Sequence, residues 1–146
     1  MRRDDGFTLF ELLVVLAIIA LVAAVALPNL RLPGFATDAA RTAREVASSL
    51  AHARQQAIHT NRESAFLVDL ADLSYRVGTE PAVTLEGIQG LTLLTAERNV
   101  VDASRGSIRF YPDGSSDGGE LAIKDTQGAT ATVRVNWLTG RISLDG

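Results

Sequence analysis

Cysteine is absent from this chain, and lysine occurs only once among its 146 residues. Without cysteine the chain can form no disulfide, so a folded domain has to be stabilised by packing alone. The net charge of −3 provides no general attraction to nucleic acid. The sequence also lacks internal repeats and low-complexity tracts. Its length predicts one globular domain beside any hydrophobic segment.

Polar side chains are scarce between Phe7 and Leu27, where only Thr8 and Glu11 interrupt an apolar run. A helix over these residues would be ~30 Å long at about 1.5 Å per residue, which is enough to cross the hydrocarbon core of a bilayer. A carboxylate inside such a segment costs roughly 3 kcal/mol, so Glu11 is expected to have a partner and a function. The run predicts a transmembrane and assembly helix over residues 7–28.

The segment at the start of this run, Gly6-Phe7-Thr8-Leu9-Phe10-Glu11, resembles the type III signal of type IV pilin-like proteins. The resemblance implies that residues 1–6 are a leader, that prepilin peptidase cuts after Gly6, and that the new N-terminus at Phe7 is methylated. Glu11 is then the fifth mature residue, whose carboxylate pairs with the N-terminal amine of a neighbouring subunit. Neither buried charge is tolerable alone, so the pair would set the axial register between subunits. Pro28 lies where many family members have a helix-kinking proline.

Two other interpretations of the N-terminus remain open. In one, residues 1–26 are an ordinary secretory signal peptide with a basic start, an apolar centre at Leu12–Val22 and a cleavage site at Ala24-Val25-Ala26. Glu11 and the acidic pair Asp4-Asp5 fit that interpretation poorly. In the other, the apolar run is a plain membrane anchor with an incidental glutamate.

A second, amphipathic helix is predicted over residues 38–61, after a hinge at Asn29–Thr37 that contains Pro33-Gly34. Asp38 is expected to be its N-cap. The apolar positions repeat with a helical spacing and predict one buried face, formed by Ala39, Ala43, Val46, Leu50, Ala53 and Ala57. The residues expected to widen this face are Ala40, Ala47, Ala51 and Ile58.

The polar residues of this helix predict a solvated outer side. Arg41 and Glu45 have the spacing of an ion pair along a helix. Arg54 projects from within the apolar arc, so its stem is expected at the edge of the core and its head in water or on a sheet carboxylate. His52 and His59 are roughly 10 Å apart along the axis, too far to share a metal, and are expected to be solvated surface histidines.

The remainder of the chain, residues 64–146, is rich in β-forming residues separated by turn residues. Strands are predicted at Ser64–Leu70, Ser74–Gly78, Leu91–Ala96, Ser107–Tyr111, Glu120–Lys124, Thr130–Trp137 and Arg141–Leu144. Residues 78–90 are expected to form a long connection or a short edge strand. The alternation in Thr130–Trp137 predicts a sheet with one packed and one wet face. A helix followed by antiparallel strands predicts an α+β domain.

The soluble part contains a second resemblance. Ala53–Ile58 at the helix end, Arg109–Ser115, and the Val133–Asn136 strand with Thr139-Gly140-Arg141 resemble the H-type minor pseudopilins of type II secretion. Minor pilins of type IV pili share this domain. The resemblance implies a pilin-like fold, in which a long N-terminal helix, half transmembrane and half amphipathic, packs on an antiparallel β-sheet or β-sandwich.

The resemblance also implies a function, that of a structural subunit near the tip of a periplasmic pseudopilus. The protein would cross the cell inner membrane once, with residues 29–146 forming a globular domain in the periplasm. Its partners would be other minor and major pseudopilins, prepilin peptidase, the inner-membrane secretion platform, inner-membrane lipid and secreted cargo. The alternative is a minor type IV pilin that acts in pilus assembly or DNA uptake. Capture of a nucleic acid backbone would require the scattered arginines to cluster, namely Arg98, Arg105, Arg109, Arg134 and Arg141.

Signals for catalysis or cofactor binding are weak in this sequence. Asp113-x-Ser115-x-Asp117-Gly118 resembles the start of a calcium loop, but Lys124 stands where a bidentate glutamate is needed, which favours a polar hairpin turn. Major pseudopilins resemble this chain and bind calcium in a loop, so a looser calcium site stays open as the alternative. Trp137 and Tyr111 are expected to be core or sheet-face aromatics. We therefore predict a structural protein that is not an enzyme, with no cofactor and no metal, whose only reaction is its own processing.

Overall fold

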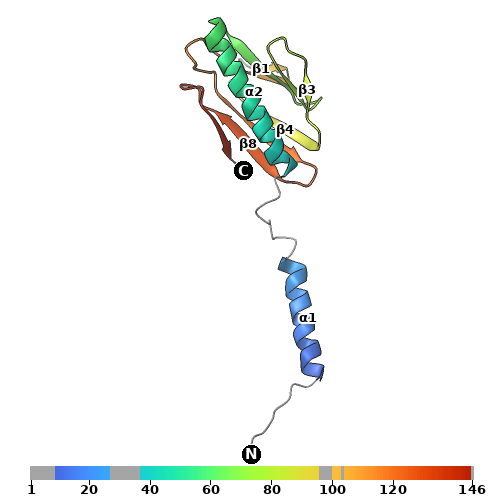
Figure 1. Ribbon diagram of the computed structural model, residues 1–146. Helices are drawn as coiled ribbons and strands as arrows, with labels where there is room; N and C mark the ends of the chain where they lie inside the picture. Colours follow the sequence, from blue (N-terminus) through green and yellow to red (C-terminus); the bar gives the residue numbers. More distant parts are fainter. Residues whose placement is uncertain (1–8, 27–36, 96–99, 103, 146) are drawn as a thin grey trace, which may run out of the picture. The chain divides into compact units, whose positions relative to one another are not determined.

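The computed structural model describes residues 9–26, 37–95, 100–102 and 104–145. The chain divides into two compact units, residues 1–35 and residues 36–146. The described part of the first unit is a single helix, α1 (Leu9–Ala26), drawn in blue in Figure 1. No helix within the described ranges is long and apolar enough to cross a membrane. The ends of the segment predicted to cross one, 7–8 and 27–28, fall outside those ranges.

The second unit begins with helix α2 (Asp38–Thr60), whose ends are both capped. Thr37 is the N-cap, and its Oγ1 accepts a hydrogen bond from the Ala40 N–H at 3.1 Å. Asp38, the expected N-cap, is instead the first helical residue, and its Oδ1 lies 3.3 Å from Nη2 of Arg41. Asn61 ends the helix in the left-handed conformation, with its N–H donating to the carbonyl of Ala57.

Two antiparallel sheets follow α2, in agreement with the predicted α+β class. In the five-stranded sheet the order is β3-β2-β1-β6-β5, with bounds β1 (Ser64–Asp69), β2 (Ser74–Val77), β3 (Val83–Thr84), β5 (Val100–Asp102) and β6 (Arg105–Phe110). In the four-stranded sheet the order is β4-β7-β8-β9, with bounds β4 (Ile88–Leu94), β7 (Gly119–Asp125), β8 (Thr130–Val135) and β9 (Ile142–Asp145). All strand pairs in both sheets are antiparallel.

The core lies where α2 packs on the inner faces of both sheets (Figure 1). The residues predicted for the buried face of α2 are all buried, which confirms its helical periodicity. Opposite them lie the large apolar side chains of both sheets, which include Phe66, Ile108, Phe110, Leu121, Ile123 and Val133. The expected widening of the face is only half right, because Ala40 and Ala47 are half-buried whereas Ala51 and Ile58 are exposed.

The predicted strands are all present, with their ends shifted by a few residues. The largest shift is in β4, which begins at Ile88, three residues before the predicted Leu91. The segment 78–90 contains β3, which is a short edge strand of the five-stranded sheet. Of the two expectations for this segment, a long connection or a short edge strand, the second is confirmed. β5 was not predicted, and it forms the other edge of that sheet.

Candidate functional site

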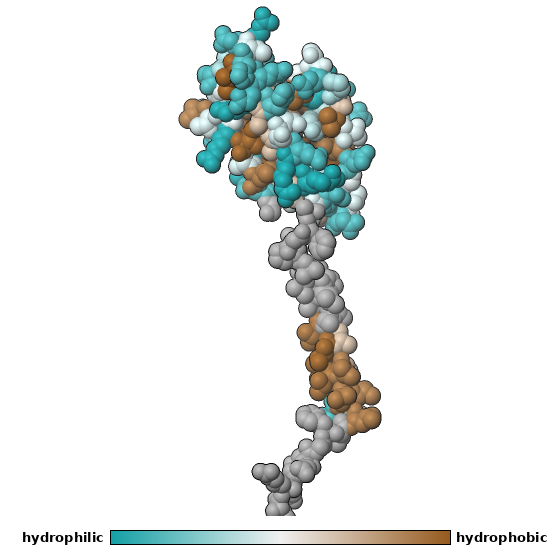
Figure 2. Space-filling model, viewed as in Figure 1, coloured by the Kyte–Doolittle hydropathy of each residue, from teal (hydrophilic) through white to brown (hydrophobic). Residues whose placement is uncertain are grey.

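Helix α1 is apolar on all sides except at Glu11, which lies in its first turn. The side chains from Leu9 to Val22 are all exposed, with Leu9 83% and Phe10 75% accessible. Figure 2 shows the described surface of α1 almost uniformly hydrophobic, in contrast to the mainly hydrophilic second unit. A helix of this kind needs an apolar environment around its whole circumference, either lipid or the helices of other subunits.

Of the predicted site residues, only Glu11 is among those described. Gly6, Phe7 and Pro28 lie outside the described ranges, as does nearly all of the predicted hinge at residues 29–37. Leader cleavage after Gly6, methylation of Phe7 and the kink at Pro28 therefore stay predictions. Glu11 lies in the first turn of α1 and its side chain is exposed. Its role in subunit assembly also stays a prediction.

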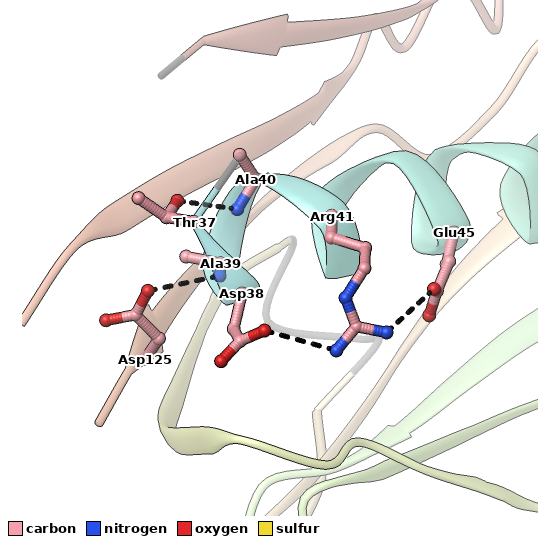
Figure 3. Close-up of polar contacts among 7 residues, drawn as sticks. All are labelled: Thr37, Asp38, Ala39, Ala40, Arg41, Glu45 and Asp125. Atoms are coloured by element: carbon pink, nitrogen blue, oxygen red, sulfur yellow. Dashed lines mark hydrogen bonds and ion pairs between the residues drawn. The ribbon is translucent and has the colours of Figure 1, made fainter. Parts of the chain in front are cut away.

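The first turn of α2, where the globular unit begins, is held by the buried carboxylate of Asp125 at the end of β7 (Figure 3). Its Oδ2 accepts from the Ala39 N–H at 3.3 Å, and its Oδ1 accepts from the N–H groups of Gln127 and Ala129 at 2.9 Å each. Only 1% of Asp125 is exposed. One carboxylate thus joins the turn between β7 and β8 to the start of α2, where the helix dipole favours a negative charge. Sequence reasoning missed this residue.

An exposed ion network lies beside this contact on the outer side of α2 (Figure 3). Arg41 bridges Asp38 and Glu45, at 3.3 Å and 3.4 Å. The predicted Arg41–Glu45 pair is therefore confirmed. Each of these side chains is about half exposed, so the network contributes little to stability.

Arg54 projects from α2 to two turns that are distant in the sequence. Its Nε donates to the carbonyl of Gly114 at 2.9 Å, and its Nη2 donates to the carbonyl of Thr139 at 3.2 Å. The acceptors are backbone carbonyls of two turns and not a sheet carboxylate, which was one of the two expectations for the head of Arg54. The contact brings together three segments that carry the second resemblance: the end of α2, Arg109–Ser115 and the residues around Thr139.

Gly140 lies at the closest approach of these two turns. Its φ is +60°, and a Cβ there would collide with the carbonyl oxygen of Gly114 and lie 2.8 Å from Nε of Arg54. We expect Gly140→Ala to lower the free energy of unfolding by about 3 kcal/mol, from left-handed strain and overpacking together. Gly128→Ala is the matched control, because Gly128 has a φ of +84° with nothing within 4 Å of its Cβ position. Urea unfolding would contradict the expectation if both variants lost the same stability.

The calcium-like loop makes hydrogen bonds within itself. Oδ1 of Asp113 accepts from the hydroxyl of Ser115 at 2.6 Å and from its N–H at 2.9 Å, and these bonds hold the pKa of Asp113 below its usual value. Oδ1 of Asp117 accepts from the hydroxyl of Tyr111 at 2.7 Å. Among the described residues there is no group of three or more acidic, histidine or cysteine side chains that could hold a metal ion.

Both histidines of α2 are exposed, as predicted. Nε2 of His52 lies 3.2 Å from Oε1 of Glu80, a neighbour on the turn after β2 that the sequence did not indicate. The expectation for Trp137 was wrong, because β8 ends at Val135 and the Trp137 side chain is 64% exposed in the following turn. Tyr111 lies just past the end of β6 and is half-buried.

The described arginines of the possible nucleic acid surface are divided between the two sheets. Arg105 and Arg109 belong to β6 of the five-stranded sheet, whereas Arg134 belongs to β8 of the four-stranded sheet. Nε of Arg105 lies 3.2 Å from Asp69. Arg134 contacts Glu120 at 3.0 Å and Asp145 at 2.8 Å, and these carboxylates raise its pKa. Arg98 lies outside the described residues.

Solved structures share this arrangement of helix and sheets. The minor pseudopilin EpsH from the type 2 secretion system of Vibrio cholerae aligns with a TM-score of 0.59 at 15% identity, over 75% of this chain and 97% of that one. The type IV minor pilin FimU of Pseudomonas aeruginosa aligns with a TM-score of 0.55 at 15% identity, over 74% and 88%. The fold is therefore the predicted pilin-like fold.

The sequence comparisons identify the family to which the chain belongs. Residues 42–140 match the family described as type II transport protein GspH, and residues 1–27 match the prokaryotic N-terminal methylation motif. The chain therefore belongs to the GspH family of type II transport proteins. No curated protein matches the chain.

Proposed function

We propose that this protein is a structural subunit near the tip of a periplasmic pseudopilus, and that it reaches the pseudopilus from the inner membrane. The observation that carries the proposal is the joint match of one chain to the GspH family over residues 42–140 and to the methylation motif over residues 1–27. The contrast between the apolar α1 and the hydrophilic second unit supports a division into an anchoring helix and a periplasmic domain.

In this proposal the two units have different partners. The apolar surface of α1 contacts inner-membrane lipid before assembly and the helices of neighbouring pseudopilins afterwards. Prepilin peptidase acts at the Gly6–Phe7 bond, and the secretion platform receives the processed subunit. The second unit contacts minor pseudopilins or secreted cargo through its sheets.

Leader cleavage is the experiment that tests this proposal. We expect mass spectrometry of the full chain, expressed with a prepilin peptidase, to find a mature protein that starts at N-methylated Phe7. Gly6→Ala should leave essentially all of the protein uncut, because the peptidase needs an unsubstituted backbone at that position. Thr8→Ser is a control that changes a side chain beside the cut but keeps the glycine. A mature chain that starts at Leu27, or one that keeps Met1, would overturn the proposal.

A second candidate function is that of a minor type IV pilin, which the likeness to FimU favours. Assembly through α1 would be the same in both cases. DNA uptake receives less support, because Arg105 and Arg134 contact carboxylates and lie on different sheets. Counterion release from a nucleic acid backbone requires several clustered cations that are not already paired.

A further inference from the structure

The four-stranded sheet ends at β9, and the outer edge of this strand is exposed. The sheet order is β4-β7-β8-β9, so β9 is paired on one side only, with β8. Arg141, just before β9, is exposed, as are Ser143, Leu144 and Asp145 within it. An edge strand of this kind is a template for another strand.

The register shows which backbone groups of β9 face the open edge. The Asn136 N–H donates to the carbonyl of Arg141 at 2.9 Å, and Arg134 is opposite Ser143. Hydrogen-bonded pairs alternate along an antiparallel ladder, so Ser143 and Asp145 direct their N–H and C=O groups toward β8. Arg141 directs only its carbonyl there, because its N–H donates to Oγ1 of Thr139. The corresponding groups of Ile142 and Leu144 therefore point to the open edge.

The sequence of this edge is complementary to itself. Consider two copies of the strand side by side and antiparallel, with Ser143 of one copy opposite Ser143 of the other. In the sequence Arg141-Ile142-Ser143-Leu144-Asp145, Arg141 of one copy is then opposite Asp145 of the other, and Ile142 is opposite Leu144. The two copies are related by a twofold axis that passes between the two Ser143 residues, so each of these two pairs occurs twice. The register also places Ile142 opposite Leu144 as a hydrogen-bonded pair, because these are the residues whose backbone groups face outward.

The side chains fit the same register. Ile142 and Leu144 are opposite Val135 and Val133, which are buried, so all four point to the inner face of the sheet. Leu144 is nevertheless 47% exposed. On the outer face, Asp145 already contacts Arg134 at 2.8 Å, so Arg141 of a second copy would extend an existing chain of opposite charges. Cross-strand pairs of these types stabilise antiparallel sheets.

We propose that two copies of this protein associate through their β9 strands, in antiparallel register about Ser143, to form one continuous eight-stranded sheet. The partner strand is a second copy of β9, because pairing the strand with its own reversed sequence places opposite charges opposite each other and apolar residues opposite each other. The contact involves one short strand per copy and is well below the roughly 1,000 Å² of a stable interface, so we expect a weak association. Confinement to one membrane would raise its occupancy through the effective concentration.

Disulfide cross-linking of the full chain tests this register, since the chain has no cysteine of its own. In membranes treated with copper phenanthroline, Ser143→Cys should form a dimer, as two thiols become one disulfide and give two electrons and two protons to the oxidant. The two Cα atoms would be ~4.5 Å apart in this non-hydrogen-bonded pair, a separation that a disulfide spans. Thr92→Cys is the control, an exposed residue on β4 at the opposite edge of the same sheet.

Two further changes in the Ser143→Cys background separate strand pairing from chance collision. Leu144→Pro removes an N–H that faces the open edge but none that bonds β8, so it should reduce cross-linking while the far-UV spectrum stays unchanged. Arg141→Asp should reduce the dimer about fivefold by placing like charges opposite each other. Adding Asp145→Arg together with Arg134→Ser should restore it, because Arg134 contacts residue 145 at 2.8 Å and would repel an arginine there.

Each of the following results would overturn the proposal. The first is that Ser143→Cys gives no more dimer than Thr92→Cys. The second is that Ser143→Cys cross-links to a protein of a different mass, which would assign the edge to another partner. Failure of the charge exchange to restore the dimer would exclude the antiparallel register. Restoration by the exchange supports it even if Leu144→Pro does not fold.

Discussion

Asp125→Ala is expected to lower the free energy of unfolding of residues 36–146 by about 3 kcal/mol, because a buried donor without an acceptor costs roughly 1–3 kcal/mol. The carboxylate accepts hydrogen bonds from three backbone N–H groups, of Ala39, Gln127 and Ala129, and is 1% exposed. Alanine removes the acceptor for all three groups at once. Urea unfolding followed by circular dichroism would measure the change.

Two variants control this experiment. Asp125→Asn keeps one oxygen for the turn but brings an amide N–H₂ toward the Ala39 N–H, so it should lose an intermediate amount of stability. Glu45→Ala removes an exposed carboxylate of α2 whose contact with Arg41 is an ion pair of 3.4 Å, and it should cost less than about 0.5 kcal/mol. Similar losses for Asp125→Ala and Glu45→Ala would show that the contact with Ala39 does not stabilise the start of α2.

The buried face of α2 was predicted correctly because helical periodicity is a local property. Ala39 and Ala57, at its two ends, are set by the spacing of apolar residues within one helix. The Asp125–Ala39 hydrogen bond joins residues 86 positions apart. No pattern along the chain indicates that an aspartate after a strand will meet the first turn of a helix so distant in sequence. The contacts of Arg54 with Gly114 and Thr139 were missed for the same reason.

Local competition explains two other differences. Thr37 and Asp38 are both residue types that cap helices, and Asp38 instead contacts Arg41, which leaves the cap to Thr37. The alternation from Thr130 predicts a strand that continues to Trp137. In the structure the side chain of Asn136 accepts from the N–H groups of Leu138 and Thr139 and turns the chain there. The strand ends at Val135, and Trp137 is therefore exposed.

The sequence predicted the position of Glu11 in α1, but it did not predict the contacts of Arg54 in the second unit. Glu11 lies in the first turn of an apolar helix, as the composition of the run indicated. The sequence shows the resemblance of each segment separately, at the end of α2, at Arg109–Ser115 and around Thr139. Only the three-dimensional structure shows that Arg54 joins these segments. A motif shows which residues belong together, whereas the fold shows what they contact.

Glu11→Leu should be cut and methylated like the unchanged protein but should enter filaments about a hundredfold less. In the proposed assembly the Glu11 carboxylate pairs with the N-terminal amine of a neighbouring subunit among apolar helices. Loss of one partner leaves the other as an uncompensated buried charge, which costs roughly 3–5 kcal/mol. Membrane insertion should improve, since a carboxylate in an apolar segment costs about 3 kcal/mol. Comparison of the filament and membrane fractions by immunoblotting would measure the effect.

Matched variants of α1 separate the charge from the shape of the side chain. Glu11→Gln has nearly the same size as glutamate but no charge, so it should fail as Glu11→Leu does. Leu12→Ile keeps an apolar side chain at an exposed neighbouring position and should enter filaments normally. If Glu11→Gln assembled normally and Glu11→Leu did not, a hydrogen bond rather than an ion pair would set the register. Normal assembly of both variants would remove Glu11 from the assembly mechanism, and α1 would then act through its apolar surface alone.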